Sequence, residues 1–178
     1  MRRQQPSLAV AYFYFDVNDA TKMTVQGLLC SMVLGLTASL GKWSYLDQVY
    51  DKCQKGCQMP GKADLMEALR GLLNEFPQVY VVMDALDECL EFEKLYASIQ
   101  TIIGWQTPGC HLLVTSRTEK YAVNEVQAVI EINLSSDVVM YDIASYVSKV
   151  MESSRLKNLR KDVQEKVKYE LLHGSNGM

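Results

Sequence analysis

Three acidic residues follow an apolar segment near the middle of the chain. The segment VYVVMD at 79–84 is a continuous run of mostly β-branched side chains, which is typical of a buried strand in a parallel sheet. Asp84 ends this run, and Asp87 and Glu88 follow it. Mg²⁺ prefers oxygen ligands, usually one or two carboxylates with water and phosphate, and a further carboxylate can orient an attacking water. The spacing therefore predicts a metal site at Asp84, with an ordinary acidic turn as the alternative.

A second group of polar residues ends the next apolar run. HLLVTSR, at 111–117, finishes in Thr115, Ser116 and Arg117. Ligands of parallel α/β sheets bind beyond the carboxyl ends of the strands, so we expect Arg117 to lie at the same edge as the acidic group. A fixed guanidinium there is suited to sensing a terminal phosphate. The alternative is a solvated arginine in a surface ion pair.

Two other motifs carry weaker signals. GCQMPGK, at 56–62, matches the first seven positions of a phosphate-binding loop, but Ala63 stands where a hydroxyl is needed and no apolar strand precedes it. Cys53 and Cys57 are spaced like metal ligands, but no second pair completes a tetrahedral set. We interpret the first as an ordinary loop and the cysteines as unliganded.

The remaining pattern alternates strands with amphipathic helices, which predicts an α/β fold with a parallel sheet covered on both faces. Thr21 is a candidate N-cap for the first helix, and Asp137 for the fifth. Trp43 and Tyr50 are expected to face inward from the second helix. The predicted strands are about 8–16, 79–84, 111–116 and 128–134, and the predicted helices about 25–36, 43–54, 65–76, 91–103, 137–151 and 156–173.

Composition limits the functional classes. The 178 residues suit one domain, and a net charge of −3 gives no reason to expect nucleic acid or an anionic membrane as a partner. No apolar run is long enough for a membrane span, and the N-terminal residues do not form a signal peptide. Five cysteines without a CxxC pair favour a reducing, cytoplasmic setting.

Three segments, in this order and spacing, resemble the NACHT domain of fungal STAND signalling proteins, also catalogued as nephrocystin-like. They are YFYFDVNDATKMTVQGLL, VYVVMDALDEC and HLLVTSRTE, and DALDEC, a Walker B pattern, is the most specific part. The resemblance implies a three-layer P-loop NTPase core and a nucleotide-dependent signalling switch. It covers nearly the whole chain, as one partial domain with a core at 8–135 and a helical extension at 137–174.

The resemblance also implies roles for the candidate residues. Asp84 would hold Mg²⁺ through water, Asp87 and Glu88 would position the hydrolytic water, and Arg117 would contact the nucleotide as the first sensor. ATP or ADP with Mg²⁺ would be the ligand. The partners would be an N-terminal effector domain, C-terminal ankyrin or WD repeats, and further copies in a homo-oligomer.

This chain departs from the family in one important respect. The family places a strand, a G-x-x-x-x-G-K-[ST] loop and a helix before the aromatic strand, which here begins almost at Met1. We therefore expect a truncated core that binds ATP weakly and hydrolyses nothing alone, with one sheet face bared by the missing helix. A non-enzymatic interaction module and an incomplete gene product remain alternatives.

Overall fold

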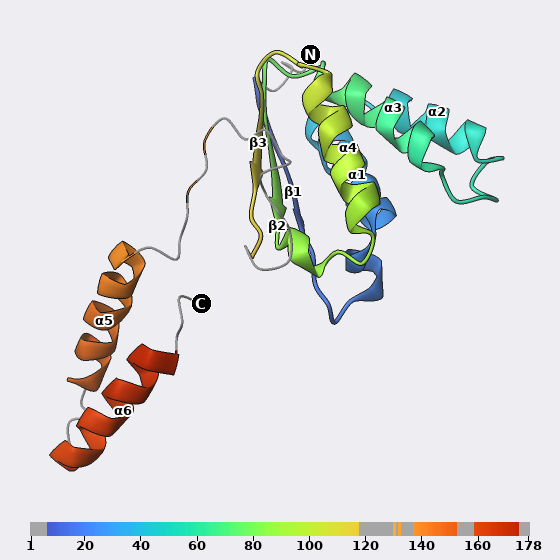
Figure 1. The fold of residues 1–178 in the computed structure, drawn as a ribbon. Helices are drawn as coiled ribbons and strands as arrows, with labels where there is room; N and C mark the ends of the chain where they lie inside the picture. The colour runs from blue at the N-terminus through green and yellow to red at the C-terminus, as the bar shows by residue number, and fades with distance from the viewer. Residues whose placement is uncertain (1–6, 118–129, 131, 133–136, 153–158, 175–178) are drawn as a thin grey trace. The chain divides into compact units, whose positions relative to one another are not determined.

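The computed structural model describes residues 7–117, 130, 132, 137–152 and 159–174 (Figure 1). The chain separates into two compact units, Met1–Gln127 and Ala128–Met178. In the described residues, the first unit is α/β and the second is helical. None of the described helices has the length and apolarity needed to cross a bilayer.

A three-stranded parallel sheet forms the centre of the first unit. Its strands are β1 (Leu8–Tyr14), β2 (Gln78–Asp84) and β3 (Cys110–Val114), in the spatial order β1-β2-β3. The pairing is in register from Leu8 opposite Gln78 to Tyr14 opposite Asp84, and from Val79 opposite Cys110 to Met83 opposite Val114. The predicted order of the first three strands is confirmed, although β1 and β3 each end two residues earlier than expected.

Helices connect these strands as the apolar periodicity predicts. The first unit contains η1 (Ala20–Met23), α1 (Val25–Leu40), α2 (Ser44–Lys52), α3 (Lys62–Leu73), η2 (Leu86–Glu88) and α4 (Phe92–Gly104). The N-cap predicted at Thr21 is wrong. Asp19 caps η1, and the Thr24 hydroxyl accepts a hydrogen bond from the Gly27 amide at the start of α1, because a short 3-10 turn separates Thr21 from the helix.

Helices α1 to α4 all lie on one side of the sheet, and the core is formed there (Figure 1). Alternate strand residues point into it, including Ala11, Phe13, Val81 and Met83, and α1 contributes five apolar side chains that are fully inaccessible. These five are Leu28, Leu29, Met32, Val33 and Leu36. Their spacing is that of a single helical face packed against the strands.

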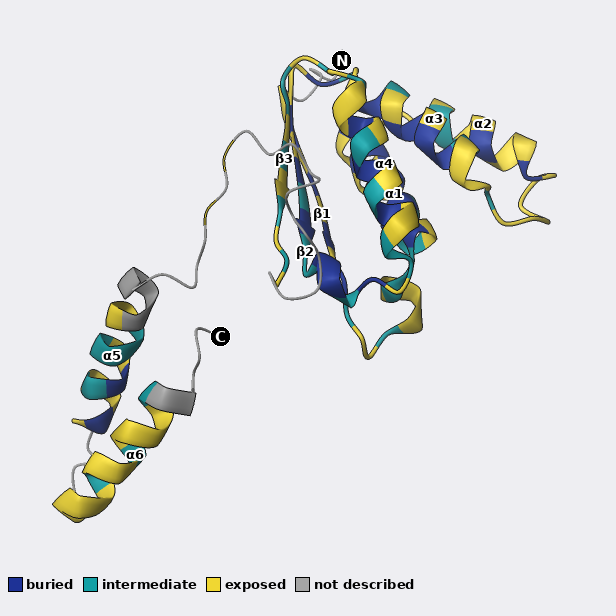
Figure 2. Cartoon of the chain, viewed as in Figure 1, coloured by how far each residue is buried: buried dark blue, intermediate teal, exposed yellow. Residues whose placement is uncertain are grey.

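The opposite face of the sheet is uncovered by any described residue of this unit (Figure 2). We call it the open face; its exposed residues are Leu8, Val10, Tyr12, Tyr14, Tyr80, His111 and Leu113. The expectation of a sheet covered on both faces is therefore wrong for the described residues, and the narrower expectation of one bared apolar face is confirmed. A buried strand sequence alone cannot say where its second cover comes from.

Two further expectations need correction. Trp43 and Tyr50 are exposed rather than inward-facing, because α2 packs on α3 through Val49 instead of reaching the sheet. The fourth strand, predicted at 128–134, falls mostly outside the described residues; Ile130 and Ile132, which are described, are exposed and not in a strand.

The second unit is a pair of packed helices, α5 (Asp137–Met151) and α6 (Lys161–Gly174). Both were predicted. Helix α5 has Asp137 as its first residue, and the cap predicted there lies outside the described side chains. Helix α6 begins five residues later than expected and extends through Gly174. Among the described residues of this unit, the buried apolar side chains are Val147 and Met151 of α5.

Candidate functional site

Asp84 lies at the carboxyl end of the central strand and is joined to the end of β3. Its Oδ1 accepts a short hydrogen bond from the Thr115 hydroxyl. The same hydroxyl oxygen accepts a hydrogen bond of 3.0 Å from the Ala85 amide. Thr115 also bonds through its backbone, because its N–H reaches the Met83 carbonyl and its carbonyl accepts the Leu86 N–H. Asp84 is therefore held in one orientation at the edge of the sheet.

A sharp turn carries the chain from Asp84 into η2. Ala85 has φ 56° and ψ 52°, the left-handed conformation that residues with a Cβ rarely adopt. The turn directs the chain so that Leu86 and Asp87 become buried. Backbone strain of this kind is common where a loop positions functional side chains.

Asp87 and Arg117 form the main ion pair of this edge. Nε of Arg117 lies 3.2 Å from Oδ2 of Asp87, and the Arg117 amide donates to Oδ1 at 3.2 Å. The Asp87 side chain is 3% exposed, whereas that of Arg117 is 66% exposed. Both oxygens of a buried carboxylate are thus engaged by one arginine. This pairing offsets the cost of burying the charge.

Glu88 joins the end of β1 to the same group. Its Oε2 accepts a hydrogen bond of 3.0 Å from the Val17 amide, just beyond β1. Its Oε1 lies 3.7 Å from a terminal guanidinium nitrogen of Arg117. Asp84, Asp87, Glu88 and Arg117 therefore gather at one edge, as predicted. Together they bind the ends of β1, β2 and β3 to one another.

The arrangement limits what each acidic residue can do chemically. Among the described residues, no three His, Cys, Asp or Glu side chains converge as a metal-binding group. Asp84 fits a Mg²⁺ site only as the single protein carboxylate, with water and phosphate as the other ligands. Asp87 is held by Arg117, and Glu88 by the Val17 amide and Arg117, so both carboxylates serve contacts within this edge.

The loop that follows is anchored to the start of α1. The Glu91 carboxylate accepts a hydrogen bond of 3.0 Å from the Val25 amide and pairs with Lys94 at 2.6 Å. The Lys94 ammonium, and then the Val25 N–H, hold the pKa of Glu91 below its ordinary value. Burial raises the pKa of the nearby Cys89 thiol, whose sulfur lies 3.5 Å from the Met23 carbonyl oxygen.

The elements on either side of the segment 56–62 are not those that flank a phosphate-binding loop. It joins α2 to α3, so no strand leads into it. Lys62 begins α3 and its ammonium donates to the Lys94 carbonyl at 3.2 Å. The interpretation of this segment as an inter-helix loop is confirmed.

Two contacts of this edge were not predicted from the sequence. The pairing of Thr115 with Asp84 had one usable signal, since both are polar residues at the ends of adjacent parallel strands. No sequence signal predicted the Val17–Glu88 hydrogen bond, because its donor is a backbone amide that every residue except proline carries.

Comparison with known proteins gives one family. A family model described as nephrocystin 3, N-terminal, matches residues 1–117, which is more than half of the 178 residues. No curated protein and no solved structure gives a significant match.

Proposed function

Because the chain belongs to the nephrocystin 3 N-terminal family, we propose that it forms part of a larger signalling protein, in which it is the metal-binding and sensor side of a NACHT-type nucleotide switch. The edge where Asp84 meets Thr115 and Arg117 meets Asp87 carries this proposal. It brings one rigid carboxylate and one guanidinium to the carboxyl ends of adjacent parallel strands, where nucleotides bind in such sheets.

The proposed division of labour follows from the contacts. Asp84, fixed by the Thr115 hydroxyl, is the residue that would hold Mg²⁺ through water. Bound Mg-ATP would supply phosphoryl oxygens and the chemistry of hydrolysis. Arg117, whose side chain is largely exposed, would sense the terminal phosphate by exchanging its pair with Asp87 and Glu88 for a phosphate contact. Asp87 and Glu88 would then be released to position water.

A phosphate-binding loop must come from elsewhere in the parent protein, because the triphosphate is held mainly by that loop's amides and lysine. Sequencing the full-length transcript tests this requirement. A G-x-x-x-x-G-K-[ST] loop encoded upstream of residue 1 supports the switch. A full-length transcript without such a loop would exclude it.

The open face favours a second candidate, a non-enzymatic interaction or oligomerisation module. Its exposed aromatic and aliphatic side chains form a contiguous surface across three strands, as the register requires. Apolar surfaces of this kind mark protein contacts. A stable, folded product of a transcript that lacks the phosphate loop would favour this candidate over the switch.

A further inference from the structure

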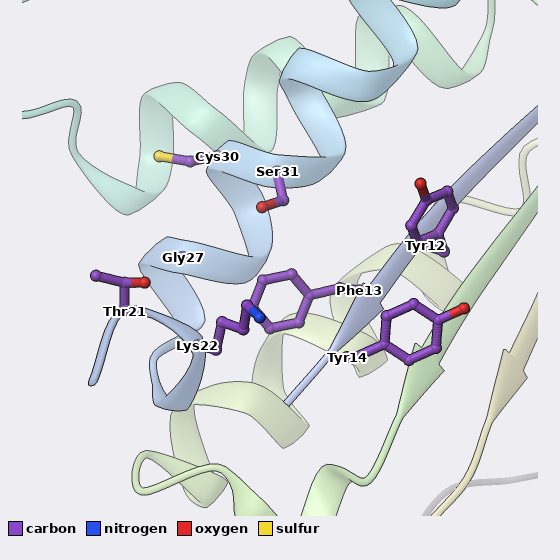
Figure 3. A pocket seen from close by; sticks show the side chains of 8 residues that line it. All are labelled: Tyr12, Phe13, Tyr14, Thr21, Lys22, Gly27, Cys30 and Ser31. Carbon is purple, nitrogen blue, oxygen red and sulfur yellow. The ribbon is translucent and has the colours of Figure 1, made fainter. Parts of the chain in front are cut away.

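A groove of about 470 Å³ runs between the outer edge of β1 and the start of α1 (Figure 3). We call it the β1 groove. It lies at the opposite side of the sheet from β3 and does not include any residue of the candidate nucleotide edge. Its lining residues are Tyr12, Phe13, Tyr14, Thr21, Lys22, Gly27, Cys30 and Ser31.

The backbone of β1 presents unpaired groups to this groove. The Phe15 amide donates to the Asp84 carbonyl, so the odd-numbered residues of β1 direct their N–H and C=O groups towards β2. Tyr12 and Tyr14 therefore direct theirs the other way, into the groove. No described strand pairs with β1 on that side. Two donors and two acceptors in strand geometry are thus exposed to a possible partner.

The facing wall is firmly built. The Thr24 hydroxyl caps α1 through the Gly27 amide, and the Thr21 carbonyl oxygen lies so near Gly27 that an added Cβ would meet it at 2.0 Å. This close approach holds η1, with Thr21 and Lys22, against the first turn of the helix. The wall and the strand edge are therefore parts of one packed unit.

The chemistry of the wall selects a type of side chain. Lys22 is the charged member of the lining, and its ammonium is only loosely paired, 3.8 Å from Asp19. Thr21 and Ser31 add hydroxyl groups. An acidic side chain directed at this wall would gain an ion pair with Lys22.

We propose that the β1 groove binds an extended peptide segment of another protein, which adds a strand to the outer edge of β1 and directs an acidic side chain towards Lys22. Main-chain hydrogen bonds to Tyr12 and Tyr14 supply the affinity, and the Lys22 wall supplies the selectivity, as in β-strand addition generally. If a second copy paired its own β1 edge with this one, its η1 and α1 would occupy the same side of the joined sheet as the groove. A single extended strand therefore fits the β1 groove better than a second copy does.

Fluorescence anisotropy of labelled heptapeptides tests the proposal on the full chain. An alternating valine–glutamate peptide is expected to bind. The same peptide, N-methylated at the residues whose amides face β1, is expected to bind at least about tenfold more weakly, because it loses its donors. Equal binding of the two peptides would overturn the proposal.

Protein variants separate the edge from the wall. Tyr12→Pro removes the outward amide but leaves the ladder to β2, and it should weaken binding by about tenfold relative to Tyr12→Thr, which retains that amide. Lys22→Glu should reverse the preference from the valine–glutamate peptide to a valine–lysine peptide. Circular dichroism confirms that each variant folds.

Two outcomes contradict the proposal. An unchanged preference in Lys22→Glu would remove the role of the wall. A chain that binds neither peptide but dimerises, and that becomes monomeric on Tyr12→Pro, would show that a second copy occupies the edge instead.

Discussion

Arg117 engages both carboxylate oxygens of Asp87, one through its backbone amide and the other through Nε, each at 3.2 Å. One residue at the end of β3 thereby neutralises a buried charge that follows β2. We predict that Arg117→Ala lowers the free energy of unfolding by about 1–2 kcal/mol, because it leaves the Asp87 carboxylate with one donor. Urea denaturation measures this change.

Lys52→Ala is the matched control for that variant, since it removes a cation from exposed pairs with Asp64 and Glu67. It should shift the unfolding midpoint much less, because exposed ion pairs contribute little. A smaller effect for Arg117→Ala than for Lys52→Ala would show that the Asp87 pair does not hold the edge together.

The anchor between Glu91 and the start of α1 predicts a pH dependence. The pKa of Glu91 in the folded chain lies below its ordinary value of 4.5, so its contribution to stability is complete above that pH and is lost as the pH falls through the lowered pKa. Glu91→Gln should therefore be less stable than the wild type at pH 7, by about 1 kcal/mol, and the difference should shrink as the pH falls below 4.5 and through the lowered pKa.

Thermal melts from pH 7 to pH 3 provide the measurement for Glu91→Gln. Glu93→Gln, two residues further on in the first turn of α4, changes the same charge where the described residues show no ion pair, and its melting temperature should follow the wild type throughout. A Glu91→Gln difference that persists unchanged at pH 3 would contradict the linkage.

The 178-residue chain alone should bind Mg-ATP weakly or not at all. Its one imitation of a phosphate loop joins two helices and has Ala63 in place of a hydroxyl residue. Titration calorimetry should give a dissociation constant above about 1 mM. If tighter binding is found and Lys62→Ala abolishes it, the segment 56–62 is a true phosphate site and its interpretation here is wrong.

The open face should make the isolated chain marginally stable and prone to associate. Replacing Tyr80 and Leu113 with lysine places two charges on this face and should shift the chain towards monomer in size-exclusion chromatography with light scattering. Tyr50→Lys is the control, because Tyr50 is similarly exposed on α2, away from the sheet. A sharply melting monomer in the wild type would contradict the expectation.

Sequence patterns predicted the elements better than their surroundings. Leu28, Leu29, Met32 and Leu36 follow a 3.6-residue period, so the buried stripe of α1 was predictable, and the apolar run at 79–84 predicted a central strand. Trp43 was assigned inward on the same reasoning and is exposed, because periodicity says which face is apolar but not what is present to cover it.

The candidate site was predictable as a place but not as a set of contacts. Parallel strands bring their carboxyl ends together, so Asp84 and Arg117 could be assigned to one edge. The burial of Asp87 and its pairing with Arg117 depend on the left-handed turn at Ala85. The sequence does not predict this turn, because the residue there is neither glycine nor asparagine.

The most direct test of the proposed switch is the Mg²⁺ dependence of ATP binding by the protein encoded in the full-length transcript. Its wild type should bind ATP at least about tenfold more tightly with Mg²⁺ than without. Asp84→Asn should lose that difference, whereas Asp64→Asn, the same chemical change on α3, should retain it. Equal Mg²⁺ dependence in Asp84→Asn and Asp64→Asn would contradict the assignment of Asp84 as the metal-binding residue.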